Sequence, residues 1–487
     1  MGIVQSQSIK NTIITFIGFG IGAVNALFLY TLFLEKEHYG IVNTILSGAN
    51  IMMPLMAFGA QNTLIRFFSA YKTQRERDEF LTFMLVLPLA FIIPLGLAFF
   101  ALYEPISHSW IKENPSLKPF FWLIPVIGLF MAYFEVFYAW AKVHMQSVIG
   151  NFISEVLVRV TIMVLLFGVH YQWITKDTFV YCVAFAYLAQ LIGMKIYALS
   201  IKMPVLRLVL PENSKDIIKY SLFIIVSGGV AVMLIDFDKV MIPRYLPVSQ
   251  NALYSVAIFI STVIAVPSRA MTQITAPITA RLMIEKKHEE LNELYKKSAI
   301  NLQVIGGFIM LLIFVNIKEM YHLIPKDYSG GIAVVFMIGI SKFYDVMLGN
   351  NNSIIVNTPY YRTVLLFGVF TVVLMIVLNM LFIPLYQIEG SAFATLVTVA
   401  IYNTIKLFFV VKKMDLYPFT NKTLYSLAII GLCFVLFYFW DFPFQTLVNI
   451  GLKSLLLSLL YGVLIYRTKL SEEINKVLDK YLKIIKL

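Results

Sequence analysis

The sequence predicts an all-α polytopic membrane protein with about 14 transmembrane helices. Three observations indicate this fold class. Hydrophobic residues make up 59% of the 487 positions and charged residues only 14%, whereas a soluble globular domain is about one-quarter charged. Apolar stretches of about 20 residues, the length that spans a bilayer, recur along the whole chain. The composition therefore excludes a water-soluble enzyme.

The predicted spans are joined by short connections. They lie near residues 11–34, 41–65, 80–102, 119–141, 147–171, 178–200, 217–237, 251–278, 299–317, 329–355, 363–386, 390–411, 423–440 and 446–466. Each must be helical, because the bilayer core offers no partners to free backbone groups.

Several spans have features of their own. The first stretch is too long for a signal-peptide core, so we interpret it as an uncleaved span. The spans near 41–65 and 251–278 contain asparagine and proline and are expected to be kinked. Connections of a few residues at Glu35–Gly40 and Gln387–Glu389 predict antiparallel hairpins.

The positive charges alternate between the two sides of this topology. Of the 39 Lys and Arg residues, 26 fall in one set of alternate connections, eight in the other set and five within spans. Cytoplasmic loops carry the excess of Lys and Arg. The asymmetry therefore predicts that both termini are cytoplasmic. It also accounts for the net charge of +12 without a nucleic-acid partner.

Two segments outside the spans have helical apolar spacing. Arg281–Ser298 and the C-terminal tail 467–487 are rich in lysine. Both are expected to lie along the cytoplasmic membrane surface, with the lysines toward anionic lipid head groups. None of the connections is long enough to bury a core of its own.

The sequence offers no motif for catalysis or for a cofactor. It has no phosphate-binding GxxxxGK[ST] and no HExxH, and its six histidines are scattered. Cys182 and Cys433 lie in apolar runs and build neither a disulfide framework nor a metal site. We therefore expect no enzyme activity, no cofactor and no metal. The energy for any transport must come from a gradient or from consumption of the product.

Charged residues within spans are costly and normally face a bundle interior or an aqueous cavity. Glu155 and Arg159 are four residues apart, so they share a helical face and can pair. Such a pair either stitches helices together or offers the arginine to a phosphate. Arg269 has no acid within four residues on its span, which favours contact with an anionic substrate. Glu135 lies in the inner half of the fourth span.

The other charges within spans leave more than one interpretation. Lys342 and Asp345 share a face and form either a lock between bundle halves or a cation site. Lys406 and Lys453 are near span ends, where their long side chains are expected to reach the interface. The predicted substrate-binding set is thus Arg159, Arg269, Lys342, Glu155, Asp345 and Glu135.

A further cluster lies where the seventh span meets the outside. Asp236, Asp238 and Lys239 are candidates for a gate contact between halves of the protein, or they are solvated charges at a helix end. Aromatic residues near span ends are typical of interfacial belts.

Three stretches carry a resemblance to a known family. They are Gly40–Phe68, Asp238–Lys239 followed by Asn251–Ala257, and Ile383–Thr395. The last has a Pro-x-Tyr start and a Gly-Ser-Ala-x-Ala-Thr end, with Gln387 where glycine is usual. On these residues the chain resembles the polysaccharide transporters and O-antigen flippases of the multidrug/oligosaccharidyl-lipid/polysaccharide exporter superfamily.

The resemblance implies an architecture. Residues 1–201 and 202–412 would form two six-helix lobes, related by a pseudo-two-fold axis along the membrane normal, around a central cavity. Residues 413–466 would add two helices, which in similar proteins sometimes form a groove for a lipid tail. Residues 467–487 would be the cytoplasmic amphipathic tail.

The resemblance also implies a function. A polyprenyl-diphosphate-linked oligosaccharide would move from the cytoplasmic to the outer leaflet of a bacterial inner membrane, for O-antigen or capsule-like polysaccharide, with H⁺ or Na⁺ as a coupling ion. Membrane lipids would be the other partners. Two alternatives stay open, a cation-coupled multidrug exporter of the same superfamily and a membrane glycosyltransferase or polymerase. The first span contains no acid, and the outside loops are short.

Overall fold

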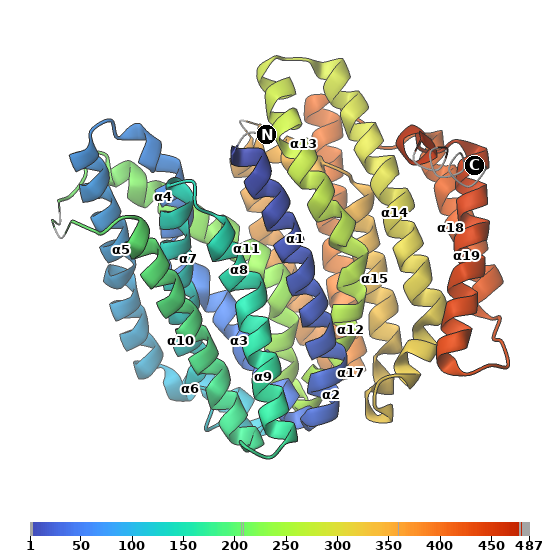
Figure 1. Cartoon of the computed structure of the whole chain (residues 1–487), viewed down its shortest axis with the longest axis horizontal. Helices are drawn as coiled ribbons and strands as arrows, with labels where there is room; N and C mark the ends of the chain where they lie inside the picture. The colour runs from blue at the N-terminus through green and yellow to red at the C-terminus, as the bar shows by residue number, and fades with distance from the viewer. Residues whose placement is uncertain (1–2, 206, 208, 359, 477–478, 480–487) are drawn as a thin grey trace. The chain divides into compact units, whose positions relative to one another are not determined.

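The computed structural model describes residues 3–205, 207, 209–358, 360–476 and 479, and within these residues every regular element is a helix (Figure 1). The prediction of an all-α membrane protein is confirmed. The chain divides into two compact units, Met1–Ser255 and Val256–Leu487. The predicted lobe boundary at residues 201 and 202 stays a prediction.

The first unit consists of helices joined by short turns. Its elements are α1 (Ile3–Val24), the π-helix η1 (Asn25–Leu29), α2 (Tyr30–Phe33), α3 (Lys36–Met56), α4 (Ala60–Phe67), η2 (Phe68–Ala70), α5 (Gln74–Ala101), α6 (Tyr103–Glu113), η3 (Pro115–Leu117), α7 (Leu123–Val143), α8 (Val148–Phe152), the π-helix η4 (Ile153–Leu157), α9 (Val158–His170), α10 (Lys176–Ile201), α11 (Ser214–Tyr245) and the start of α12 (Ser249–Thr262). Phe80, Trp140 and their neighbours form a buried core between α4, α5, α7 and α10. In this unit α7 packs against α3 and α10, and α11 packs against α3.

The second unit begins within α12. It continues with η5 (Val263–Ala265), α13 (Val266–Ile284), α14 (His288–His322), η6 (Lys326–Gly331), α15 (Ile332–Met347), α16 (Asn351–Val356), α17 (Tyr361–Met414), α18 (Asn421–Tyr438) and α19 (Thr446–Thr468). Here α14 packs against α13, α15, α18 and α19, and α15 packs against α17.

The described residues contain 11 helices long and apolar enough to cross a membrane, or up to 13 if each of two bent pairs counts as one span. The predicted count of 14 is not confirmed. The difference lies at α17, which contains both predicted spans 363–386 and 390–411 and is broken at Gln387 (φ 54°, ψ −135°). Across this break Ser391 Oγ donates to Asn379 Oδ1 at 2.7 Å, and the Phe382 and Phe393 rings meet edge to face. These contacts fit the hairpin predicted at Gln387–Glu389.

The kink predicted near 41–65 is present, and the helix near 251–278 is irregular. The first is a bend of 42° between α3 and α4, where Phe58 and Gly59 both have positive φ. A residue with positive φ interrupts the helical ladder, and glycine takes this conformation at no steric cost. In the second region the α-helix is interrupted by the 3₁₀ turn η5, which precedes Pro267 in the first turn of α13.

The segment Arg281–Ser298 is not a helix of its own, and its position along the membrane surface stays a prediction. The segment consists of the end of α13 and the first turns of α14, joined by a turn in which Lys286 has positive φ. Apolar spacing at the end of a long membrane helix looks like that of a surface helix, because both present one apolar stripe. Ten of the 21 residues of the predicted tail 467–487 lie outside the described residues, and the others include the end of α19 and a helical turn at residues 472–476.

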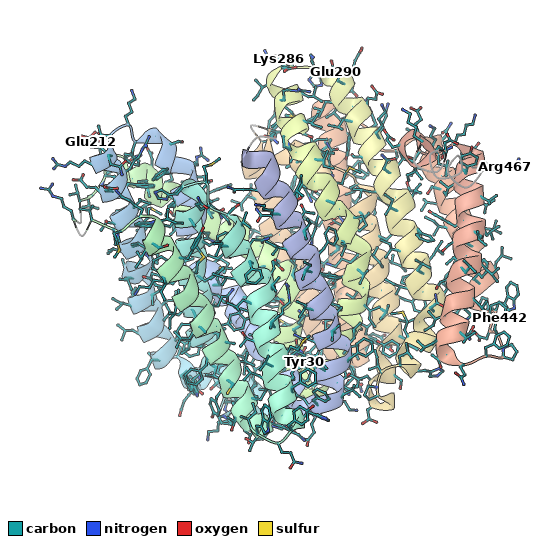
Figure 2. All side chains as sticks on the ribbon, in the orientation of Figure 1. Tyr30, Glu212, Lys286, Glu290, Phe442 and Arg467 are labelled. Atoms are coloured by element: carbon teal, nitrogen blue, oxygen red, sulfur yellow. The ribbon has the colours of Figure 1, made fainter. Side chains whose placement is uncertain are left out.

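In each unit, the residues labelled in Figure 2 lie at opposite ends of the helices. In the second unit, Lys286, Glu290 and Arg467 lie at the end of the bundle opposite to Phe442 (Figure 2). In the first unit, Glu212 and Tyr30 lie at opposite ends. The assignment of the lysine-rich ends to the cytoplasm remains a prediction from the charge pattern.

Candidate functional site

Glu155 and Arg159 form the intrahelical ion pair that their spacing predicts. Arg159 Nη1 donates to Glu155 Oε2 at 2.5 Å, and 34% and 26% of the two side chains are exposed. Glu155 lies within the π-helix η4, where one extra residue per turn widens the helix. Such π-bulges frequently occur at functional sites. The pair is therefore partly accessible and sits on an irregular turn of the span.

Helix α1 packs directly on this pair. It has its own π-helix, η1, from which Asn25 Nδ2 donates to the Arg159 carbonyl at 2.8 Å. At Gly18 the approach is so close that an added Cβ would lie 2.4 Å from the Glu155 carbonyl and 2.7 Å from Arg159 Nη1. The seam between α1–η1 and η4–α9 thus contains two π-helices, with η4 packed on α1 and η1 packed on α9.

Tyr187 on α10 lies in the neighbourhood of both Arg159 and Asp236. Glu135 lies on α7 and interacts with Lys142, whose Nζ is 3.6 Å from the centroid of the Tyr138 ring. Glu135 on α7 and the Glu155–Arg159 pair on η4–α9 thus belong to segments that both pack on α10.

Asp236 is a buried hub between α11 and α3. Its carboxylate accepts from Ser47 Oγ at 3.0 Å, from Asn50 Nδ2 at 3.1 Å and from Lys239 Nζ at 3.0 Å. Because Ser47 and Asn50 belong to the second predicted span and Asp236 to the seventh, the hub joins spans of the two predicted lobes. These charges lie inside α11, which continues to Tyr245, so they are paired and largely buried rather than solvated at a helix end.

Asp238 and Asn251 extend the polar group toward α12. Asp238 accepts from the Tyr254 hydroxyl at 2.5 Å. The Asn251 amide donates to Thr44 Oγ1 and to the Lys239 carbonyl, each at 2.8 Å. Asp236, Asp238 and Lys239 are thus brought together as predicted, although their role as a gate stays a prediction.

Arg269 lies apart from these clusters. It is an exposed residue in the first turn of α13, a helix without any acidic residue. No intrahelical partner neutralises it, in agreement with the sequence. Contact with a substrate stays a prediction.

Asp345 pairs with Lys406, whose side chain was expected to reach the membrane interface. Its Oδ1 lies 3.8 Å from Lys406 Nζ, and Lys406 also donates to Asn352 Oδ1 at 3.0 Å. Only 3% of the Lys406 side chain is exposed. The prediction that Lys406 reaches the interface is therefore wrong: its ammonium points into the second unit, where a carboxylate and an amide replace water. Lys342 lies one turn before Asp345 on α15.

Lys453 is a second lysine for which the predicted exposure is wrong. Its ammonium contacts Glu319 Oε1 at 2.9 Å and also Asp441, with 1% of Lys453 and 7% of Glu319 exposed. Asn449 donates to the same Glu319 oxygen at 3.0 Å. The sequence did not single out Glu319 as a partner, because it lies near the end of a predicted span. The one signal for the pair was that Glu319 and Lys453 each interrupt an otherwise apolar stretch.

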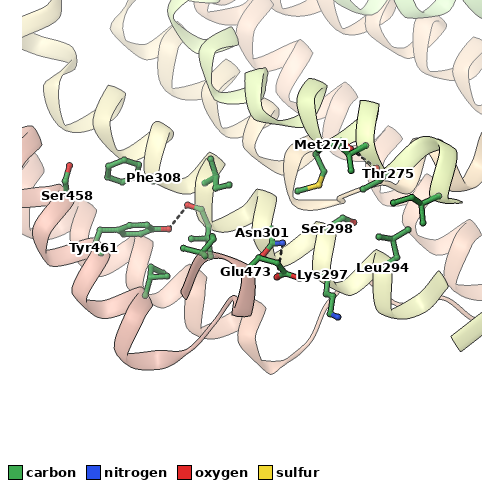
Figure 3. A pocket seen from close by; sticks show the side chains of 17 residues that line it. Met271, Thr275, Leu294, Lys297, Ser298, Asn301, Phe308, Ser458, Tyr461 and Glu473 are labelled. Atoms are coloured by element: carbon green, nitrogen blue, oxygen red, sulfur yellow. Dashed lines mark hydrogen bonds between the residues drawn. The ribbon is translucent and has the colours of Figure 1, made fainter. Parts of the chain in front are cut away.

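An elongated apolar cavity opens between α13, α14 and α19. Its volume is about 740 Å³, and it is lined mainly by aliphatic and aromatic side chains such as Ile274, Phe308 and Tyr461 (Figure 3). Tyr461 is fixed by a hydrogen bond from its hydroxyl to the Val304 carbonyl at 2.8 Å. Farther along α14 and α19 lies a cavity of about 540 Å³ that shares Phe308 and Ser458 with the first. The two form one groove beside α19.

One end of this groove is polar. Lys297, Ser298 and Asn301 of α14 line it together with Glu473, which follows α19. Asn301 Nδ2 donates to Glu473 Oε2 at 3.2 Å (Figure 3). A long apolar channel with a polar mouth matches an amphipathic ligand in which a hydrocarbon chain carries a polar head. Among the described residues, no group of three or more His, Cys, Asp or Glu side chains could hold a metal ion.

Comparisons with known proteins identify the family and the fold. Residues 6–283 match the profile of a family described as "Polysaccharide biosynthesis protein". No curated protein matches the sequence. The structure resembles "Lipid II flippase MurJ, inward closed conformation" with a TM-score of 0.71 at 14% identity, over 94% of this chain and 99% of that one.

Two further solved structures share the fold. One is an inward-facing multidrug resistance MATE family transporter of the MOP superfamily, with a TM-score of 0.60 at 12% identity, over 85% of this chain and 94% of that one. The other is an outward-facing transporter of the same kind, with a TM-score of 0.56 at 11% identity, over 88% and 96%. These three neighbours are a flippase and two transporters rather than enzymes.

Proposed function

Since the chain belongs to the polysaccharide biosynthesis protein family, we propose that this membrane flippase/transporter moves a polyprenyl-diphosphate-linked oligosaccharide from the cytoplasmic to the outer leaflet. The observation that carries the proposal is the groove beside α19. It offers an apolar channel of about 740 Å³ with a polar mouth, which suits a polyprenyl chain attached to a charged head group. The product would serve O-antigen or capsule-like polysaccharide.

The diphosphate would be held by arginine. Arg159 is partly exposed and has one carboxylate partner, Glu155, and a guanidinium fork binds phosphate in two-point geometry. Glu155 would compete with the phosphate for Arg159 and so help to release it. Arg269, exposed and without an acid on its own helix, would supply a second positive charge. Glu135, Lys342 and Asp345 complete the proposed set of substrate-cavity residues.

Transport would follow alternating access between the lobes 1–201 and 202–412. In this scheme the Asp236 hub, with Asp238 and Lys239, forms the outer gate, because it ties α11 to α3 through Ser47 and Asn50. Residues 413–466 form the side of the groove, and 467–487 are its cytoplasmic tail. The protein would lie in a bacterial inner membrane with both termini in the cytoplasm, as its charge asymmetry favours.

A cation-coupled multidrug exporter is the second candidate, since two of the structural neighbours are multidrug resistance transporters. Buried acids in the first lobe would serve such an exporter. Glu135 is only half-buried, Glu155 is already paired with Arg159, and α1 contains no acid. The lipid-sized groove favours the flippase. A membrane glycosyltransferase or polymerase would need an extramembrane catalytic domain, which the short connections do not provide.

The test uses the full-length protein in liposomes, with a fluorescent polyprenyl-diphosphate oligosaccharide whose outer-leaflet fraction is read by quenching. Gly462 lines the groove and has open space at its Cβ position, and Gly431 on α18 has open space but does not line it. Gly462→Phe should fill the groove and stop translocation, whereas Gly431→Phe should leave it intact. Arg159→Gln with Arg269→Gln should also stop it.

Two outcomes would reject the proposal. One is unchanged translocation in Gly462→Phe and in the double arginine variant. The other is a wild-type protein that leaves the lipid-linked glycan in place but carries lipophilic cations across the membrane. The second outcome would favour the exporter.

A further inference from the structure

A buried lysine lies in the second unit without the full set of partners that an ammonium needs. Lys406 Nζ donates one hydrogen bond, to Asn352 Oδ1 at 3.0 Å. The Asp345 carboxylate is 3.8 Å away, beyond hydrogen-bond distance, and the Tyr402 ring centroid is at 4.4 Å. A charge at membrane depth held by one hydrogen bond and a loose ion pair is costly. Such a group is expected to serve a function.

Lys406 faces a break in a span. Helix α15 ends at Met347 and α16 begins at Asn351, and Gly349 between them has a φ of +59°. The break is fixed by Asn350, whose Oδ1 accepts from Ser298 Oγ at 3.0 Å and whose Nδ2 donates to Thr279 Oγ1 at 2.8 Å. Interrupted helices in transporters surround substrate and coupling-ion sites.

Asp345 connects the buried amine to the surface of the unit. Its side chain is 42% exposed, whereas that of Lys406 is 3% exposed. The carboxylate is therefore open at the surface of the unit, whereas the amine is enclosed behind it. This difference in exposure suits a two-step proton path. The exposed carboxylate would receive a proton, and the amine behind it would store the proton.

Two buried amides beside Lys406 have no protein partner. Asn351, which precedes Asn352, and Asn403, one turn before Lys406 on α17, are each 1% exposed. Both amide atoms of each side chain are without a hydrogen-bond partner among the described residues. Buried polar groups are normally satisfied, by water where protein is lacking. The surroundings of Lys406 can thus accommodate water or a rearranged hydrogen-bond network.

Few other charges face this lysine. The helices that pack on α17 are α15 and α16. From α15 come Asp345, Lys342 and Tyr344, and α16 carries no titratable residue. Tyr402 is the neighbour on α17 itself, and the hydroxyl of Tyr344 bonds Thr404 at 2.9 Å. When Lys406 is protonated, its ammonium itself takes the position of a cation beside Asp345.

We propose that the Lys406 amine, with Asp345 as its relay and the α15–α16 break as the moving element, is the proton-binding site that couples transport to a proton gradient. The proposal rests on the proposed flippase function for the process that is coupled. A proton from outside water protonates the Asp345 carboxylate and passes to the neutral amine, giving an ammonium beside a carboxylate. Release of that proton to cytoplasmic water restores the neutral amine, which no longer attracts Asp345, and α15 can separate from α17.

The test measures proton binding without any substrate. The full-length protein in liposomes on a solid-supported membrane is exposed to a pH jump, and the displaced charge is recorded. Lys406→Met removes the amine. Lys406→Arg keeps a positive charge for Asp345 but does not lose its proton. Lys412→Met, an exposed lysine on the same helix, is the matched control.

The wild type and Lys412→Met should give the charge displacement, and both Lys406 variants should lose it. Lys406→Arg is decisive, because a lysine that only locks α17 to α15 would be replaced by arginine without loss. The proposal is overturned if Lys406→Arg keeps the displacement, if the wild type gives none, or if a sodium jump at constant pH gives a displacement that Lys406→Met abolishes.

The same liposomes separate this proposal from the flippase proposal. Charge displacement that depends on Lys406, without translocation of the lipid-linked glycan, would leave the proton site standing and reject the flippase function. If the protein gave no charge displacement but moved the lipid-linked glycan at a rate that a pH gradient does not change, the flippase function would stand and the proton site would be rejected.

Discussion

Lys453 Nζ lies 2.9 Å from Glu319 Oε1, and both side chains are buried between α14 and α19. Asn449 donates to the same oxygen, and Asp441 contacts the lysine from the α18–α19 connection. This cluster fixes α19 on α14. It lies beside the groove, because Met320 and Ser454, which follow Glu319 and Lys453 in sequence, line the groove's cavity of about 540 Å³.

Breaking this pair on one side should destabilise the protein strongly. Lys453→Met leaves a buried carboxylate uncompensated, at a cost of about 3–5 kcal/mol. Replacing both residues, Glu319→Leu with Lys453→Met, removes both charges and should recover most of the loss. Thermal unfolding in detergent measures the two, with Lys318→Met, an exposed lysine, as the control. A double variant no more stable than the single one would contradict the ion-pair account.

Gly18 and Gly20 offer a matched test of the seam between α1 and η4. A methyl group at Gly18 would lie 2.4 Å from the Glu155 carbonyl, whereas nothing lies within 4 Å at Gly20. Gly18→Ala should therefore push α1 away and cost about 1–3 kcal/mol, the usual effect of overpacking. Gly20→Ala should be neutral or slightly stabilising, because alanine favours helices. Thermal unfolding together with translocation checks both, and equal effects would refute the close packing.

Asp236→Asn should loosen α11 from α3. The amide offers one acceptor where the carboxylate accepts from Ser47, Asn50 and Lys239, and Lys239 loses its counter-charge. A lost hydrogen bond to a charged group costs about 1.5–3 kcal/mol. Hydrogen exchange should rise in peptides from α3 and α11. Glu37→Gln, an exposed acid in the first turn of α3, should leave it unchanged, and equal exchange in Asp236→Asn would disprove the hub.

The sequence alone predicts those features that depend on local spacing. Long apolar runs identify the spans because the bilayer sets their length, and Glu155 and Arg159 pair because residues four apart on a helix are neighbours. The kink at Gly59 and the break at Gln387 follow from proline, glycine and polar residues within or between spans.

Partners distant in sequence could not be predicted in this way. Lys453 bonds a residue 134 positions away and Lys406 one that is 54 positions away. In the sequence, each of these lysines has the position of one that extends to the interface. The buried acceptor becomes visible only when α14 packs on α19, or α16 on α17. The groove is equally invisible in sequence, since its lining residues have the composition of ordinary lipid-facing helices.

Ser471 should hold the chain that closes the polar end of the groove. Its hydroxyl donates to Asn301 Oδ1 at 2.5 Å and accepts from the Ile474 amide at 3.1 Å, so it both caps the following turn and ties it to α14. Loss of a helix N-cap costs about 0.5–2 kcal/mol. Ser471→Ala should raise hydrogen exchange over residues 470–476, with global unfolding little changed. Ser458→Ala, which loses only a bond within α19, should leave that exchange unchanged. Because Glu473 and Ile474 line the groove, unchanged exchange in Ser471→Ala would mean that other contacts close it.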